Sequence, residues 1–134
     1  MGKTYIDSSI ALALLLREIS YGVITDEYED LLASELLELE CRRTLDRIRI
    51  QEGLPDAQIA ELLSDLDLIL SSIRIVQLSA PIIKRAKGSF PTVIRSLDAL
   101  HLATAELSNV SVFLSRDKQQ ATAAKAMGLK TVIL

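Results

Sequence analysis

The sequence has very little of several residue types on which particular classes of protein depend. Its 134 residues include one cysteine, one histidine, two phenylalanines, three tyrosines and no tryptophan. The single cysteine, Cys41, excludes an internal disulfide framework and fits a protein of the reducing cytosol. One cysteine and one histidine leave almost no ligands for a structural zinc site. So few aromatic side chains argue against a stacking platform for single-stranded nucleic acid.

Long hydrophobic runs and an excess of basic charge are also absent. The apolar run at 10–16 is far shorter than the ~18 residues of a membrane span, and no signal-peptide cleavage site follows it. The net charge of −3 provides no overall field for tight binding to duplex nucleic acid. Nucleic acid remains open as a substrate, because a local basic patch or a bound cation can reverse the field at one site. We therefore expect a cytoplasmic protein without a membrane segment.

Short apolar segments alternate along the chain with segments of helical periodicity. Strands are expected at 3–7, 31–34, 73–79, 110–115 and 130–134, and helices at 8–20, about 34–50, 56–72, 80–88, 95–108 and 118–128. The least regular segment, 21–30, is expected to be a loop with a short helix. This alternation predicts an α/β fold with a mainly parallel central sheet. The length corresponds to one domain, residues 1–134.

Two aspartates lie at the carboxyl ends of expected strands. Asp7 ends the first strand, and Asp117 follows the fourth by two residues; each comes directly before a helix. These ends share one edge of a parallel sheet, where sites in such folds form, so the two side chains should be neighbours. Taken singly, each is equally explained as a turn residue or helix N-cap. The helix after Asp7 is itself expected to be capped by Ser8 or Ser9.

A third acid, Glu40, breaks the pattern of the long helix at 34–50. The apolar arc of this helix is predicted to contain Leu36, Leu37, Leu39, Cys41, Leu45 and Ile48. Glu40 projects into this arc, facing the core alongside Arg43 and Arg47. An unpaired buried carboxylate costs several kcal/mol, so one alternative is a glutamate at the edge of the core that pairs with a neighbouring arginine.

A fourth acid, Asp98, lies in the helix at 95–108, one turn before His101. Ser96 is the expected N-cap, and an acid near it is ordinarily explained by the positive end of the helix dipole. If all four acids meet, their mutual repulsion forces some to stay protonated unless a cation intervenes. Carboxylate oxygens without thiolate or imidazole partners select Mg²⁺ or Mn²⁺. Such sites characteristically act on phosphate esters.

Four segments of the chain resemble, in order and spacing, the successive motifs of PIN-domain ribonucleases. The resemblance is greatest to the VapC-type toxins of bacterial and archaeal toxin–antitoxin pairs, and it extends over nearly the whole chain. The segments are YIDSSIALALLL, SELLELECRRTL, RSLDALHLATA and LSRDKQQATAAKAMGLKTV. The most specific parts are LDALHLATA and the final Ser-Arg-Asp before an alanine-rich helix. The resemblance implies a PIN-like three-layer fold with helices on both faces of the sheet.

The resemblance also implies roles for individual residues. The acidic set of the family, which binds metal and carries catalysis, falls on Asp7, Glu40, Asp98 and Asp117. The small hydroxyl residues beside the metal site match Ser9 and Ser115. Arg43 is expected to orient Glu40, and His101 is expected to be a helix-packing residue.

The implied activity is that of a metal-dependent endonuclease that cleaves structured RNA. Its cofactor would be Mg²⁺ or Mn²⁺, and attack by metal-activated water would leave a 5′-phosphate and a 3′-hydroxyl. The family also implies a homodimer, and inhibition by a cognate antitoxin whose C-terminal segment enters the acidic site. The RNA backbone would be held by one of two basic clusters, each of which could equally be a solvated helix face. These are Arg42, Arg43 and Arg47, or Lys84, Arg85 and Lys87.

Two alternatives come from other functional classes. One is a PIN fold without activity that serves as a binding module, although such a scaffold has no need to concentrate acids. The other is an aspartyl-phosphate protein, because Asp7 ends a strand. The phosphatase pattern requires a second aspartate two residues later, where this chain has Ser9. A receiver domain requires a lysine near the site, for which Lys118 is a poor candidate.

Overall fold

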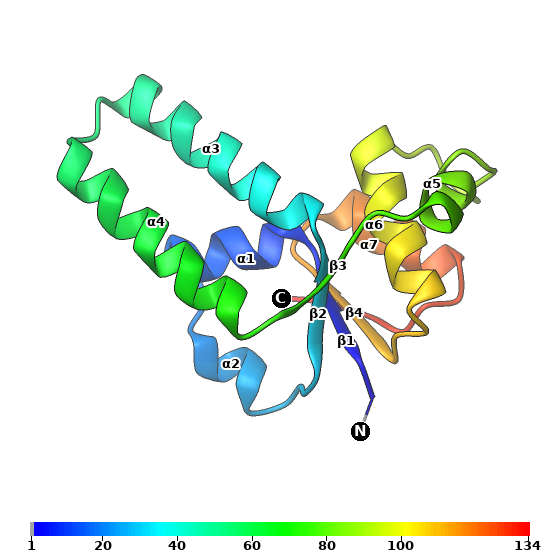
Figure 1. The fold of residues 1–134 in the computed structure, drawn as a ribbon. Helices are drawn as coiled ribbons and strands as arrows, with labels where there is room; N and C mark the ends of the chain where they lie inside the picture. The colour runs from blue at the N-terminus through cyan, green and yellow to red at the C-terminus, as the bar shows by residue number, and fades with distance from the viewer. Residues whose placement is uncertain (1) are drawn as a thin grey trace.

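Five short strands form one sheet in which all neighbouring strands are parallel (Figure 1). The structure is a computed structural model, and it describes residues 2–134. The strands are β1 (Thr4–Ile6), β2 (Leu31–Ser34), β3 (Arg74–Val76), β4 (Val112–Ser115) and β5 (Thr131–Ile133). Their order across the sheet is β3-β2-β1-β4-β5. The predicted α/β class is confirmed, and the sheet is entirely rather than mainly parallel.

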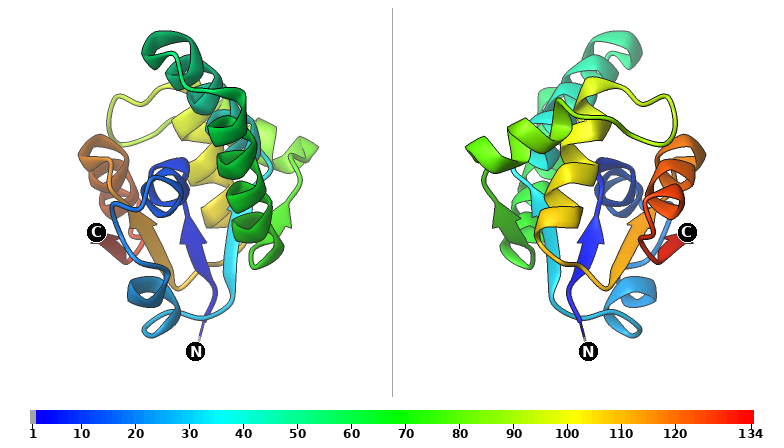
Figure 2. Two further views of the ribbon diagram at one scale, coloured as in Figure 1. Left: turned by 90° about the vertical axis from the view of Figure 1, so that its left-hand side faces the viewer. Right: turned by 90° about the vertical axis from the view of Figure 1, so that its right-hand side faces the viewer.

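Helices cover both faces of this sheet, so the fold has three layers: helices, sheet and helices (Figure 2). In chain order they are α1 (Ser8–Leu15), α2 (Tyr21–Thr25), α3 (Leu36–Glu52), α4 (Asp56–Ser71), α5 (Ala80–Ala86), α6 (Ser96–Leu107) and α7 (Lys118–Ala126). One hydrophobic core lies between the sheet and α1, α3 and α4, and a second lies beneath α6 and α7. Within residues 2–134, no helix is long and apolar enough to cross a membrane.

The alternation of side chains along β1 divides these two cores. Ile6 is fully buried against α1 and α3, whereas the preceding Tyr5 is fully buried on the opposite face. The Tyr5 ring stacks on Phe113 of β4, with a centroid distance of 5.2 Å and an interplanar angle of 10°. Neighbouring residues of a strand point to opposite faces, so a central strand buried on both sides is apolar throughout.

The central position of β1 determines where a crevice can form. The chain leaves β1 for β2 on one side of the sheet, and β4 pairs with β1 on the other side. The carboxyl ends of β1 and β4 therefore lie beside the point where the strand order reverses. The helices α1 and α7 begin directly after these two strands, and α6, which leads into the start of β4, also begins at this edge (Figure 1).

Two helix caps differ from the prediction. Asp7, not Ser8 or Ser9, is the N-cap of α1, because its extended backbone lets the carboxylate accept the first free N–H groups. The helix ends at Leu15, and the backbone reverses at Arg17, where φ is 61°. Ser96 is already the first helical residue of α6, and Arg95 precedes it without a side-chain cap.

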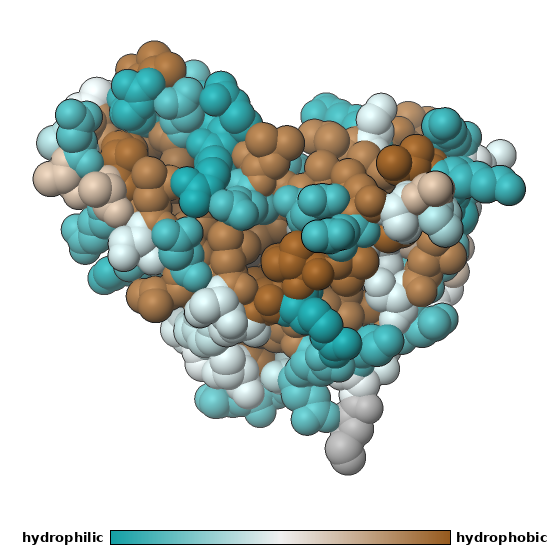
Figure 3. All heavy atoms as spheres, in the orientation of Figure 1, coloured by the Kyte–Doolittle hydropathy of each residue, from teal (hydrophilic) through white to brown (hydrophobic). Residues whose placement is uncertain are grey.

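The apolar arc of α3 is narrower than predicted. Leu36, Leu37, Cys41 and Leu45 are buried, but Leu39 is 55% exposed and Ile48 is only half-buried. The antiparallel pair α3 and α4 extends past the sheet as a separate lobe (Figure 1), so α3 packs mainly on α1 and α4. The space-filling view shows this lobe divided by a notch from the lobe that carries α5 and α6 (Figure 3).

We expect Leu37→Ala to lower the free energy of unfolding by about 2–5 kcal/mol, because it empties space in a closed core. Leu39→Ala is the matched control on the same helix, and it should change stability by no more than about 0.5 kcal/mol. Urea unfolding followed by circular dichroism measures both. Equal losses for the two variants would contradict the burial pattern of α3.

Candidate active site

One cleft at the carboxyl edge of the sheet contains all four acids that the sequence indicates. Its volume is about 90 Å³, enough for several waters at roughly 30 Å³ each. Its lining consists of Asp7, Ser8, Ser9, Glu40, Asp98, His101, Asp117 and Gln120. These residues come from the ends of β1 and β4 and from α1, α3, α6 and α7. The fold thus brings the predicted acids together, while their chemical role stays a prediction.

Asp7 is the most buried of the four acids, with 4% of its surface exposed. Its Oδ1 accepts the backbone N–H groups of Ser9 (3.1 Å) and Ile10 (3.3 Å) and the Ser9 hydroxyl (2.5 Å). Its Oδ2 accepts the hydroxyl of Ser115 at 2.5 Å. Burial raises the pKa of Asp7, against the opposing effect of the hydrogen bonds from Ser115 and Ser9. The two predicted hydroxyl residues therefore contact this carboxylate directly.

Glu40 lies in the second turn of α3, with 23% of its side chain exposed. Its Oε1 accepts the hydroxyl of Ser8 at 2.6 Å and lies 2.5 Å from Nε2 of His101. Burial acts to raise the pKa of this carboxyl group, but the hydrogen bonds from His101 and Ser8 outweigh burial and lower the pKa. Glu40 is therefore held as an anion by partners from α1 and α6.

The predicted surroundings of Glu40 were wrong. Glu40 faces the cleft and not the core, and Arg43 does not orient it. The guanidinium of Arg43 lies 3.3 Å from the carboxylate of Asp46, one turn further along α3, and its side chain is exposed. Arg47 is also exposed. An exposed arginine keeps its hydration on the helix surface, so the partners of Glu40 come from other elements.

Asp98 and Asp117 complete the acidic lining. Asp98 lies half-buried in the first turn of α6, and no hydrogen bond among residues 2–134 reaches its carboxylate. Burial raises its pKa most, and the negative charges of Asp117, Glu40 and Asp7 raise it further. Asp117 is exposed, and its Oδ1 accepts the N–H groups of Gln119 (2.9 Å) and Gln120 (3.2 Å).

Both aspartates that follow strands are helix N-caps as well as cleft residues. Asp7 caps α1 and Asp117 caps α7, and both also line the cleft, so the two interpretations do not exclude each other. Each helix start stabilises an anion by about 0.3–1 kcal/mol. The pKa of Asp98 is raised first by burial and then by the negative charges of the other acids in the cleft. The cleft therefore retains negative charge that a cation would neutralise.

Sequence reasoning missed three polar residues of the cleft. Ser8, expected only as a possible helix cap, donates its hydroxyl to Glu40. His101, predicted to serve only in packing, is 1% exposed and contacts Glu40; its place one turn after Asp98 was the available signal. Gln120 is also 1% exposed, and neither Oε1 nor Nε2 of its amide has a hydrogen-bond partner among the described residues. Only the three-residue spacing from Asp117 hints that this amide belongs to the site.

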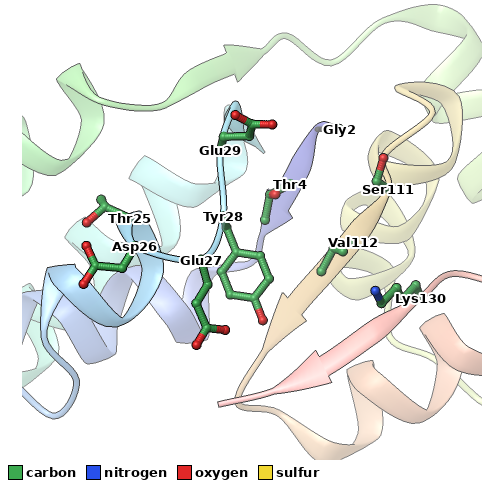
Figure 4. A pocket seen from close by; sticks show the side chains of 10 residues that line it. All are labelled: Gly2, Thr4, Thr25, Asp26, Glu27, Tyr28, Glu29, Ser111, Val112 and Lys130. Atoms are coloured by element: carbon green, nitrogen blue, oxygen red, sulfur yellow. The ribbon is translucent and has the colours of Figure 1, made fainter.

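A larger cavity, about 530 Å³, lies at the opposite, amino edge of the sheet (Figure 4). It is lined by residues from the starts of β1 and β4 and from the segment before β2, with Tyr28 between them. In Figure 4 the carboxylates of Asp26, Glu27 and Glu29 lie apart and do not converge on one point. Size alone therefore does not identify the site, since open α/β sheets carry their sites at the carboxyl edge.

The cleft suits a hydrated hard cation. Within residues 2–134, no three His, Cys, Asp or Glu side chains are grouped closely enough to hold a metal ion by themselves. Mg²⁺ commonly keeps several waters and binds through one or two carboxylates, so it does not require such a group. Most of the donors that line the cleft are carboxylate and hydroxyl oxygens, and the imidazole of His101 and the amide of Gln120 complete the lining. The unpartnered amide of Gln120 indicates that the cleft is completed by a ligand or by water.

The protein is thus a three-layer α/β protein with an all-parallel sheet and an acidic cleft where the strand order reverses. The chain belongs to the PIN-domain family, whose family model matches residues 4–126. This membership confirms the resemblance found in the sequence motifs. It gives no support to the aspartyl-phosphate alternative.

Three solved structures share this fold. One, described as a toxin–antitoxin complex from Klebsiella pneumoniae, has a TM-score of 0.66 and 15% identity, and the match covers 97% of this chain and 96% of that chain. PAE2754 from Pyrobaculum aerophilum has a TM-score of 0.70 and 22% identity, with 97% and 83% covered. VapBC2 from Rickettsia felis, bound to a DNA fragment from its promoter, has a TM-score of 0.72 and 14% identity, with 98% of both chains covered. At these identities the likeness shows the fold alone. No curated protein sequence matches the chain.

We expect Asp98→Asn to raise the free energy of unfolding at pH 7 by up to about 1 kcal/mol. A raised pKa in the folded state means that ionised Asp98 destabilises the fold at neutral pH. This penalty disappears as the pH falls through the folded-state pKa, so the gain should shrink towards pH 4. Urea unfolding at the two pH values measures it. The control is Glu61→Gln, on the exposed face of α4, which should show no such dependence.

We expect Gln120→Met to stabilise the protein without added ligand by about 1 kcal/mol, because it removes a buried amide that has no partner. Gln119→Met changes the exposed neighbour and should bring no gain. Thermal unfolding of both variants provides the comparison. A loss of stability in Gln120→Met would mean that the amide is satisfied within the fold.

Proposed function

We propose that the protein is a VapC-like endoribonuclease that hydrolyses phosphodiester bonds in structured RNA with the help of Mg²⁺ or Mn²⁺. The observation that carries this proposal is the single cleft lined by four carboxylates at the edge of a PIN fold. Retaining so many acids without a neutralising partner opposes folding, as the raised pKa of Asp98 indicates. A reaction that depends on a bound cation explains why the four acids are kept together, because the cation would neutralise their charge.

Asp7, Asp98 and Asp117 would hold the ion, with Glu40 completing the site directly or through water. A bound divalent cation lowers the pKa of a coordinated water and offsets the charge of the phosphate. Ser9 and Ser115 fix both oxygens of Asp7. Glu40 uses Oε1 for its partners, and no hydrogen bond within residues 2–134 occupies Oε2. This second oxygen is available to orient the attacking water, and in-line attack leaves a 5′-phosphate and a 3′-hydroxyl.

Cationic side chains at the rim of the cleft would hold the RNA backbone. Arg42 is paired with Glu38 and Asp67, and Arg85 is paired with Glu106, so both expected basic clusters are partly engaged within the fold. Arg95 and Lys118 stand at the starts of α6 and α7, beside Asp98 and Asp117. Both are exposed, and within residues 2–134 neither forms a salt bridge. We assign them as the phosphate contacts nearest the acids.

The protein would be controlled by a cognate antitoxin that covers the cleft. Two structures with this fold support such a partner, one described as a toxin–antitoxin complex and the other as VapBC2. An antitoxin segment that enters an acidic cleft would carry a basic side chain, since opposite charge offsets the repulsion there. The homodimer and the cytoplasmic location stay predictions.

Cleavage of a 5′-labelled, structured transfer RNA with added Mn²⁺ tests the proposal. We expect Asp7→Asn, Glu40→Gln and Asp98→Asn each to reduce the cleavage rate by roughly 100-fold or more, because each removes charge from the transition-state environment. EDTA should abolish cleavage by the unaltered protein. The matched control is Glu38→Gln, on the same helix as Glu40 but paired on the surface with Arg42.

The product ends and the control separate the nuclease from its alternative. Labelled fragments that end in a 3′-hydroxyl, and full activity in Glu38→Gln, are the expected results. If the unaltered protein cleaves none of several structured RNAs but binds a protein partner tightly, the inactive PIN-fold module is the correct description.

A further inference from the structure

Glu40 lies at the end of a buried chain of hydrogen bonds that the acidic site does not by itself explain. The side chain of His101 is 1% exposed, yet both of its ring nitrogens have polar neighbours. Nδ1 lies 2.6 Å from the hydroxyl of Tyr5, and Nε2 lies 2.5 Å from Oε1 of Glu40. The Tyr5 hydroxyl in turn accepts the backbone N–H of Ser34 at 3.3 Å. The contacts therefore run from the end of β2, through β1 and α6, to the cleft.

The count of donors and acceptors determines which atom donates and which accepts in each of these hydrogen bonds. The Tyr5 hydroxyl receives the Ser34 N–H, so its own proton must go elsewhere, and among the described residues Nδ1 of His101 is its only acceptor. An Nδ1 that accepts leaves the ring proton on Nε2, where it meets an oxygen of Glu40. Burial raises the pKa of Tyr5, which keeps the phenol protonated and able to donate. Every group in the chain then has a partner.

We propose that Tyr5 and His101 are positioning residues that hold Glu40 in place through the neutral Nε2–H tautomer of His101. This inference rests on the proposed function of Glu40 in the acidic site. Glu40 is on α3, whose outer half projects past the sheet with α4 (Figure 1), and it has a long side chain with several rotamers. The chain of hydrogen bonds connects that side chain to the central strands. The hydroxyl of Ser8 contacts the same Oε1 at 2.6 Å and lies 3.3 Å from Nε2 of His101.

The packing around Tyr5 leaves the chain of hydrogen bonds little freedom to rearrange. The phenol ring is fully buried, stacks on Phe113 and meets the His101 ring edge-on at a centroid distance of 5.9 Å. A ring fixed in this way aims its hydroxyl at one place. Positioning partners of this kind typically change activity by 10–100-fold when removed.

Nuclear magnetic resonance tests the tautomer without any assay of activity. The chain has one histidine, so an untagged, ¹⁵N-labelled sample gives a single set of ring signals. We expect a protonated nitrogen coupled to both ring carbon-bound protons, which is Nε2, and an unprotonated Nδ1. Tyr5→Phe removes the hydroxyl that donates to Nδ1, so it should shift the signal of this unprotonated nitrogen, whereas Phe113→Leu, which alters packing on the same ring, should leave that signal in place. A protonated Nδ1 in the unaltered protein would overturn the proposal.

Two substitutions of His101 test the positioning role in RNA cleavage. The amide of His101→Gln can reach the place of Nε2 and still donate to Glu40, whereas the shorter His101→Asn reaches only the place of Nδ1. We expect kcat to fall at least about tenfold in His101→Asn and to stay within about threefold in His101→Gln. KM should remain nearly unchanged in both variants, and thermal unfolding should give similar stabilities.

The outcomes separate this inference from the proposed nuclease activity. If the protein cleaves RNA and both His101 variants are equally active or equally impaired, the positioning role is wrong and the nuclease assignment stands. If the unaltered protein cleaves no RNA, the proposed function fails, and with it the catalytic purpose of the chain of hydrogen bonds. The resonance experiment would still decide whether that chain exists with the direction assigned.

Discussion

Repulsion among carboxylates at one edge of the sheet is the constraint around which this structure is organised. Asp7, Glu40, Asp98 and Asp117 line a single small cleft, and the pKa of Asp98 is raised by burial and by its acidic neighbours. The fold tolerates this charge by placing helix starts and hydroxyl groups against it. The compensation is incomplete, and this is the basis of the cation-dependent function that we propose.

The four carboxylates differ in their hydrogen-bond partners, and we expect them to differ in their chemical roles for this reason. Asp7 is enclosed by hydroxyl and backbone donors and is mostly buried, although it lines the cleft. Glu40 is fixed through His101 and Ser8, with its other oxygen facing no hydrogen-bond partner among residues 2–134. The carboxylate of Asp98 accepts no hydrogen bond within residues 2–134, so it is the acid that a positive partner would stabilise most. This contrast between a rigid acid and an unsatisfied acid underlies the ion-binding role that we propose.

The central strand β1 links the site to both cores. Ile6 belongs to the core under α1 and α3, Tyr5 belongs to the core under α6, and the next residue is Asp7. Three consecutive residues thus contribute one side chain to each core and one to the cleft. Because the Tyr5 hydroxyl also contacts His101, the polar chain crosses from the second core into the site. Stability and site geometry are therefore tied to the same short strand.

Local order along the chain was enough to predict the α/β class, most element positions, and the placement of Asp7 and Asp117. A strand followed at once by a helix puts the connecting residue at the carboxyl edge, whatever the rest of the chain does. The surroundings of Glu40 could not be predicted in this way, since periodicity gives an angle on one helix but not the neighbour it meets. Contacts such as His101 with Tyr5, 96 residues apart, and the unpartnered amide of Gln120 arise only when distant elements pack together. The sequence by itself therefore determined which acids stand at the sheet edge, and the tertiary structure decided which partners hold them, because partners are set by packing between elements and not by order within them.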